Sequence, residues 1–182
     1  MRRGLLLINL GTPQNPGISA VRNYLRVFLT DKRVIDLPAL LRYLLVYVFI
    51  LPFRAKRSAH AYETIWTEQG SPLLYHSQNL IAQIQKEIGT EYRVALGMRY
   101  GTPSIATALE TLKHCDSITI LPLYPQYSSA ANGSSIEEVM KRMPEKTAHI
   151  FKLSKIDELP VKKIAEQMNL SEKAVEYHIT KS

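Results

Sequence analysis

The chain has 182 residues, of which 46% are hydrophobic and 21% charged, and this balance predicts a folded core rather than a disordered chain. The formal charge of +7 is compatible with binding to nucleic acid, to an anionic membrane surface or to a substrate with carboxylates. The charge alone therefore does not identify the class of partner. Cys115 is the only cysteine, which excludes a disulfide framework and fits a reducing cytosol. The short apolar run after Arg3 ends at Gly11 without a small-residue cleavage site, so we expect a first strand there and not a signal peptide.

Short apolar runs alternate with helix-period segments as far as about residue 140. The strand-like runs cover residues 4–10, 92–97 and 117–123. Helices are expected over residues 18–29, 37–51, 58–66, 72–88 and 104–114, with N-terminal signals at Ser71-Pro72 and at Thr102-Pro103-Ser104. Strands separated by helices predict an α/β fold with a doubly wound parallel sheet that is covered on both faces.

The most apolar stretch runs from Tyr43 to Phe53 and is flanked by Arg42 and by the cations Arg54, Lys56 and Arg57. It is too short to span a bilayer, which needs about 20 apolar residues. Two interpretations remain open. The stretch is either a buried core helix or a hydrophobic lip that touches a membrane surface with help from the flanking cations.

The first candidate site is the motif Asn9-Leu10-Gly11-Thr12-Pro13, at the end of the first predicted strand. Ligands of open α/β sheets bind at the carboxyl ends of strands, where glycine lets the backbone approach them, although this motif alone could be an ordinary turn. Four motifs follow in order: DKRVIDLP at 31–38, WTEQGSPL at 66–73, GMRYG at 97–101 and YPQYS at 124–128. Together the five motifs resemble the ferrochelatase family over about residues 1–140.

The resemblance implies ferrous iron and protoporphyrin IX as substrates, no bound cofactor and a chelatase-like domain that is one of the family's two. We expect a cytoplasmic location, with peripheral membrane contact through residues 43–53 as the alternative left open above. Protoporphyrin is a flat apolar disc with propionate groups, so its site needs apolar walls and Arg or hydroxyl partners. By motif position, the resemblance implies porphyrin contacts from Leu10, Arg54, Tyr62, Ser71, Arg99, Tyr100 and Tyr124.

Ordinary structural roles are the alternative for these residues. Arg54 could be a solvated charge, Tyr62 and Tyr124 could be half-buried aromatics with satisfied hydroxyls, and Arg99 could form a structural ion pair.

The proton acceptor that metallation requires has no counterpart in this sequence. The family uses a His in a motif resembling Ser-x-His-Gly-Leu-Pro, supported by a Glu. The sequence has five histidines, and none of them has those neighbours. They are His60, His76, His114, His149 and His178. We therefore assign no catalytic residue and leave the metal-binding residues open. We expect a ferrochelatase-family protein that ends before the catalytic His and is poorly active or inactive.

The pattern changes after Met140, and residues 141–182 predict only helices, over 146–155, 161–168 and 172–180. Residues 169–171 form the expected turn, with Ser171 as an N-cap. This segment resembles the C-terminal helix-turn-helix of an extracytoplasmic-function RNA polymerase sigma factor, which reads promoter DNA. That resemblance implies DNA contacts from the second helix through Glu172, Lys173, Glu176, Tyr177 and Lys181.

We therefore expect two domains, a porphyrin-binding domain at 1–140 and a small all-α helix-turn-helix at 141–182. The alternative for the second is a helical hairpin that packs without DNA. No Gly/Ser/Pro-rich linker separates the two, whereas natural fusions usually have one, so we hypothesise a composite chain, from an engineered fusion, a frameshifted or misassembled gene, or recombination. Two functions follow as hypotheses: a module of ferrochelatase lineage, or a DNA-binding factor acting through residues 141–182.

Overall fold

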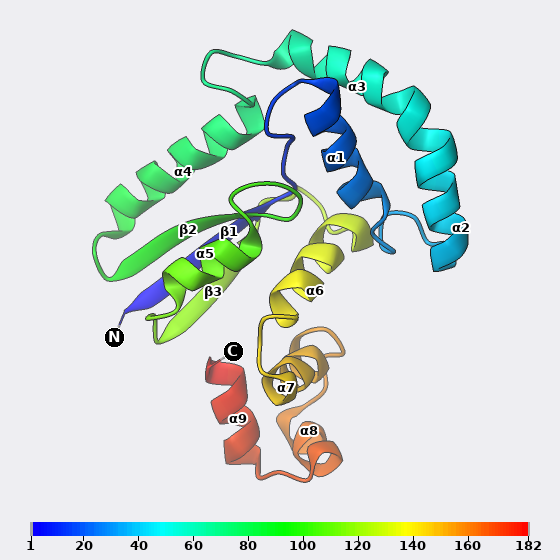
Figure 1. Ribbon diagram of the computed structural model, residues 1–182. Coiled ribbons are helices and arrows are strands. Elements are labelled where there is room, and N and C mark those ends of the chain that lie inside the picture. The colour runs from blue at the N-terminus through cyan, green and yellow to red at the C-terminus, as the bar shows by residue number, and fades with distance from the viewer. Residues whose placement is uncertain (1, 182) are drawn as a thin grey trace.

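A three-stranded parallel sheet forms the centre of the protein. The computed structural model describes residues 2–181, with side chains described for residues 2–179. Strands β1 (Arg3–Asn9), β2 (Tyr92–Met98) and β3 (Ser117–Pro122) lie in the order β2-β1-β3 (Figure 1). Leu6 of β1 pairs with Ala95 on one side and Ile120 on the other, and it is fully buried. The predicted α/β fold with a parallel sheet is confirmed.

Helices connect the strands and cover the sheet. The side chain of Gln85 closes the outer edge of β2, because its amide nitrogen donates to the Tyr92 carbonyl at 2.9 Å and its amide oxygen accepts from the Val94 N–H at 2.9 Å. Figure 1 shows α5 in front of the sheet and α4 beside β2. The helical elements up to residue 140 are α1 (Ile18–Leu29), α2 (Ala39–Leu44), η1 (Leu45–Ile50), α3 (Leu51–Ile65), α4 (Pro72–Ile88), α5 (Ile105–Leu112), η2 (Ser129–Gly133) and α6 (Ser134–Met140).

The elements α2, η1 and α3 follow one another without a break, so the prediction of separate helices at 37–51 and 58–66 is wrong. Pro52 lies at the start of α3, where a missing N–H is tolerated, and the wider π-helical turn of η1 precedes it.

The apolar stretch is mostly exposed, so the interpretation of Tyr43 to Phe53 as a buried core helix is also wrong. Phe53 is 78% exposed and Phe49 59%, whereas Val46 and Leu51 face the core. The stretch stays exposed because only one side of η1 packs on α1. None of the helices described in residues 2–181 combines the length and the apolar character needed to cross a bilayer.

The loops that follow β1 and β2 are in direct contact at the carboxyl edge of the sheet. Arg99 and Tyr100 donate their backbone N–H groups to the carbonyls of Asn9 and Leu10, both at 2.8 Å. Gly11 has a φ of 107°, and a Cβ at this position would lie 1.6 Å from the Tyr100 carbonyl oxygen. Only glycine therefore allows the two loops to approach this closely.

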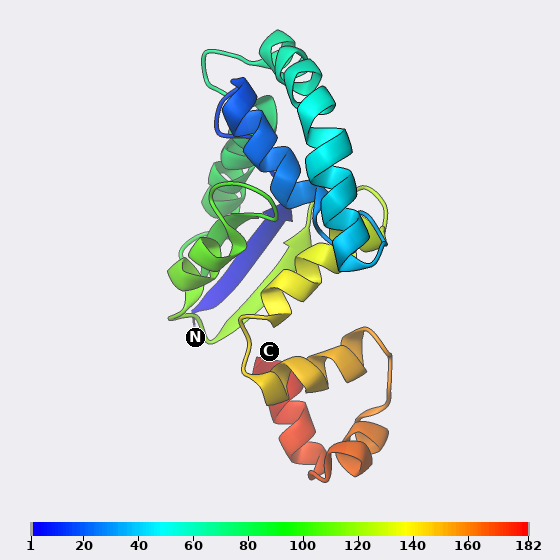
Figure 2. The same ribbon diagram turned by 45° about the vertical axis from the view of Figure 1, so that its right-hand side comes forward.

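Residues after Met143 form three helices, α7 (Glu145–Lys155), α8 (Val161–Met168) and α9 (Glu172–Lys181). They share a separate apolar core of Ile150, Leu153, Ile164, Ala165 and Val175. Figures 1 and 2 show this unit at the end of the sheet opposite the carboxyl edge. The predicted turn is confirmed, because Asn169 is left-handed and the Ser171 hydroxyl accepts from the Ala174 N–H at 3.2 Å.

Candidate ligand-binding site

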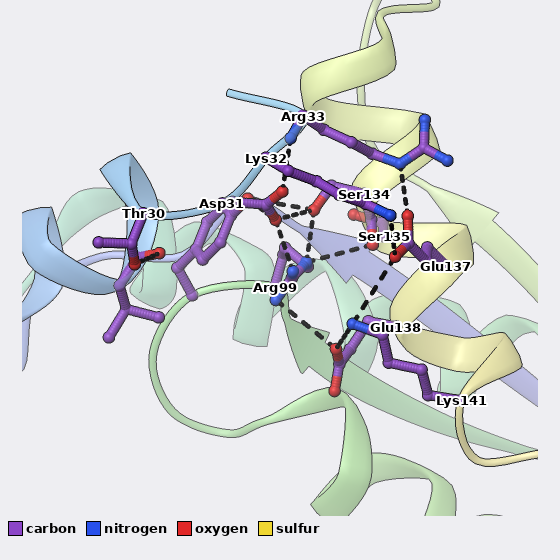
Figure 3. Close-up of polar contacts among 12 residues, drawn as sticks. Thr30, Asp31, Lys32, Arg33, Arg99, Ser134, Ser135, Glu137, Glu138 and Lys141 are labelled. Atoms are coloured by element: carbon purple, nitrogen blue, oxygen red, sulfur yellow. Dashed lines mark hydrogen bonds and ion pairs between the residues drawn. The ribbon is translucent and has the colours of Figure 1, made fainter. Parts of the chain in front are cut away.

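The carboxylate of Asp31 is the centre of a polar network at the carboxyl edge (Figure 3). One oxygen accepts three hydrogen bonds, from Arg99 Nη2 at 2.6 Å, the Tyr100 hydroxyl at 2.8 Å and the Ser134 hydroxyl at 2.6 Å. The other oxygen accepts from the backbone N–H of Arg33 at 2.8 Å. The network thus joins the loop after α1, the end of β2 and the start of α6.

Two glutamates of α6 extend this network toward solvent. Glu137 bonds Arg33 Nε at 2.6 Å and pairs with Lys32 at 3.4 Å and Lys141 at 3.8 Å. Glu138 approaches Arg99 Nη1 at 3.8 Å. As Figure 3 shows, cations of both the α1 loop and α6 meet these carboxylates.

The surroundings of Asp31 and Tyr100 keep these two groups in fixed protonation states at neutral pH. Burial alone would raise the pKa of Asp31, but hydrogen bonds from Ser134, the Arg33 N–H and Tyr100, with the charge of Arg99, hold this pKa below its ordinary value of 3.8. Burial raises the pKa of the Tyr100 phenol well above its usual value of 10. The carboxylate is therefore charged and the phenol neutral, so neither group accepts a proton readily.

Three of the predicted porphyrin contacts meet next to α1. Leu10 and Tyr62 pack against the apolar cluster that contains Tyr100 and Tyr24. The rings of Tyr24 and Tyr62 are edge to face, with centroids 6.3 Å apart. Tyr100 itself is only 1% exposed, so its ring lines the interior in this structure.

The other predicted contacts are spread around this cluster. Arg99 has the structural ion pair that the sequence left as an alternative, with a side chain 13% exposed. The half-buried Tyr124 shares a hydrogen bond of 2.9 Å with Ser135, and Ser71 is buried directly before α4. Arg54 lies on α3. The porphyrin contacts of all seven residues remain a prediction.

Arg54 lines an open hollow of about 690 Å³ on the outer side of α3 and η1. Phe49 and Phe53 line this hollow together with Arg54 and Arg57. Apolar surface next to fixed cations is the combination that an amphipathic anion requires.

The predicted DNA contacts on α9 fall on its outer face. Glu172, Lys173, Glu176 and Tyr177 are exposed, while the side chain of Lys181 lies outside the described residues. These contacts also remain a prediction.

Sequence reasoning did not assign a role to Asp31, Ser134 or Glu137, although each falls in a motif or helix that the sequence singled out. Asp31 and Ser134 are 103 positions apart, and no local pattern signals their pairing. Across the described residues, no group of three or more His, Cys, Asp and Glu side chains is placed to hold a metal ion. Metal-binding residues therefore remain unassigned.

Open α/β domains bind ligands at the carboxyl edge of the sheet, and in this chain that edge carries a charge-paired polar network beside aromatic side chains. Residues 2–171 match the ferrochelatase family, and the chain belongs to that family. The matched range includes α7 and α8, beyond the boundary expected at residue 140.

Curated relatives are similar over a shorter range. The chain is 67% identical over 143 residues to a ferrochelatase of Legionella pneumophila (strain Philadelphia 1), covering 79% of this chain and 43% of the relative. It is 53% identical over 138 residues to a ferrochelatase of Coxiella burnetii (strain Dugway 5J108-111), covering 75% of this chain and 39% of the relative. The chain thus spans about two fifths of the length of these relatives.

The charge of Asp31 should stabilise the fold in a pH-dependent way. We expect Asp31→Asn to lower the free energy of unfolding at pH 7 by about 3 kcal/mol, because the buried guanidinium of Arg99 loses its close ion pair at 2.6 Å and keeps only Glu138 at 3.8 Å. A depressed pKa stabilises the fold fully above the ordinary value of 3.8, and this contribution is lost as the pH falls below it. Denaturant unfolding of both proteins at pH 7 and pH 3 measures the difference, which should shrink at pH 3.

Asp36→Ala is the matched control, because Asp36 is an exposed carboxylate in the same loop. It should change stability little at either pH. An Asp31→Asn effect that does not vary with pH would show that the carboxylate charge is not what holds the network.

Proposed function

We propose that this chain supplies the porphyrin-binding wall for insertion of ferrous iron into protoporphyrin IX. Membership of the ferrochelatase family supports the substrate class, and the hollow beside α3 supports the binding mode. Phe49 and Phe53 would contact the apolar macrocycle, while Arg54 and Arg57 would pair with its propionates. Leu10, Tyr62 and Tyr100 would support the macrocycle from the interior side.

Binding without efficient metallation is the behaviour we propose for these 182 residues. Metal entry requires a group that accepts the pyrrole protons. Asp31 is an ion-paired carboxylate of low pKa, and Tyr100 is a buried phenol of raised pKa. Neither suits proton transfer near pH 7, and none of the histidines has the family's catalytic neighbours.

A porphyrin titration tests this proposal. Deuteroporphyrin IX, a soluble dicarboxylate porphyrin, should quench the fluorescence of the single tryptophan, Trp66, whose ring centroid lies 6.4 Å from that of Tyr62. Arg54→Gln with Arg57→Gln should weaken binding about tenfold or more, because charge-assisted hydrogen bonds to propionates are lost. Arg22→Gln with Arg26→Gln, on the exposed side of α1, is the control and should bind normally.

Zinc insertion into the same porphyrin, followed by fluorescence, should be slow. Rapid turnover by the 182-residue chain would contradict the proposed lack of a proton acceptor. Absence of porphyrin binding would contradict the binding role itself.

We further propose that the apolar lip from Tyr43 to Phe53 touches a membrane surface. Within this lip Phe49 is 59% and Phe53 78% exposed, next to the cations of α3, and this pairing of apolar and basic groups favours anionic bilayers. Phe49→Asp with Phe53→Asp should lower co-sedimentation with phosphatidylglycerol vesicles about tenfold, since two phenyl rings no longer insert. Ile18→Asp, on α1 and 46% exposed, is the control. Equal losses in both variants would contradict a localised lip.

A second candidate function is DNA binding through α8 and α9. The observation that favours it is the tight turn at Asn169 between two helices that share a core with α7. Lys173 and Tyr177 would then contact a major groove, although Glu172 and Glu176 on the same face oppose strong binding.

Salt-dependent DNA binding tests this second candidate. Lys173→Glu should weaken binding severalfold and reduce the slope against salt by about one, as expected for one lost phosphate contact. Lys86→Glu, exposed on α4, is the control. Binding that both substitutions weaken equally would indicate nonspecific attraction to the net positive charge.

A further inference from the structure

A separate pocket lies where the sheet-containing part of the chain, residues 2–140, meets the three-helix unit of α7, α8 and α9. It has a volume of about 460 Å³, and its lining comes from η2 and α6 on one side and from α7 on the other. Figure 2 shows α6 leading directly into α7 at this junction. Ile136, Met140 and Ile156 give the pocket an apolar lining. Its volume is within the range of small-molecule sites, roughly 300–1,000 Å³.

Cations line this pocket from both sides. Arg33 lines the pocket from the sheet-containing part of the chain, and Lys152 and Lys155 line it from α7. The helix is amphipathic, because Ile150 and Leu153 are buried in the core of the three-helix unit. The side of α7 that carries the two lysines therefore faces the sheet-containing part of the chain.

The acidic group in the lining does not balance these charges. Glu137 is shared between Arg33, Lys32 and Lys141. No ion pair of Lys152 or Lys155 is found within the part of the chain that the structure describes. An anion in the pocket would relieve the repulsion between these two lysines, which are three residues apart on one helix.

We propose that this pocket binds an amphiphilic anion, a compact apolar molecule that carries one carboxylate, sulfonate or phosphate group. The apolar body contacts Ile136, Met140 and Ile156, and the charged group pairs with Lys152 and Lys155 opposite Arg33. A polar anion alone would not use the apolar lining, and a neutral molecule would not use the cations. The site is distinct from the hollow on α3, so it goes beyond the proposed porphyrin function.

Two fluorescent probes with the same aromatic body separate these requirements. 1-Anilinonaphthalene-8-sulfonate carries a sulfonate, whereas N-phenyl-1-naphthylamine is its neutral counterpart. In titrations of the full chain, Lys152→Gln with Lys155→Gln should weaken one class of sulfonate-probe sites about tenfold, the loss expected for two exposed ion pairs. Binding of the neutral probe should change less than twofold, because the apolar lining is intact.

Matched variants assign the signal to this pocket. Lys162→Gln with Lys163→Gln removes two exposed lysines from α8, outside the pocket, and should leave both probes unaffected. Arg54→Gln with Arg57→Gln removes any probe bound in the hollow on α3 and should leave the lysine-dependent class in place. Dodecanoate should displace the sulfonate probe from that class, whereas inorganic phosphate should not.

Equal effects of the α7 and α8 lysine pairs would overturn the proposal, because they would show attraction to general positive charge. An equal loss of affinity for the charged and the neutral probe in the α7 variant would also overturn the proposal. Displacement by inorganic phosphate alone would show a site for simple anions and contradict the need for an apolar body.

Discussion

The carboxylate of Asp31 holds together segments that the sheet alone would leave independent. Its two oxygens accept hydrogen bonds from Arg99, Tyr100, Ser134 and the backbone of Arg33. The side chain is only 9% exposed, so these bonds form largely out of water, where an unpaired charge would be costly. The loop after α1, the end of β2 and the start of α6 therefore depend on one another.

The residues that hold these segments together differ from the residues that would contact a ligand. Arg99 and Tyr100 form internal hydrogen bonds with Asp31, whereas Arg54 and Arg57 of α3 line an open hollow together with exposed phenyl rings. Fixed protonation states in the network favour rigidity over proton transfer. These features support the proposed role of binding a porphyrin over a role in accepting its pyrrole protons.

Local patterns predicted the elements of this fold well. The strands follow from brief aliphatic runs, and the turn at Asn169 and the cap at Ser171 follow from local turn and capping chemistry. The polar network could not be predicted, because Asp31 and Ser134 are 103 positions apart and meet only when the sheet forms. The exposure of Phe53 was equally hidden, since apolar composition does not say which side of a helix lacks a neighbour.

The central claim is that Asp31 couples three distant segments, and hydrogen–deuterium exchange of Asp31→Asn tests it most directly. The account predicts faster amide exchange over residues 28–35, 98–104 and 128–140 together, because all three regions bond directly or indirectly to this carboxylate. Residues 3–9 and 92–97 should stay protected, since their ladder does not involve Asp31. Faster exchange confined to residues 30–33 would contradict the coupling.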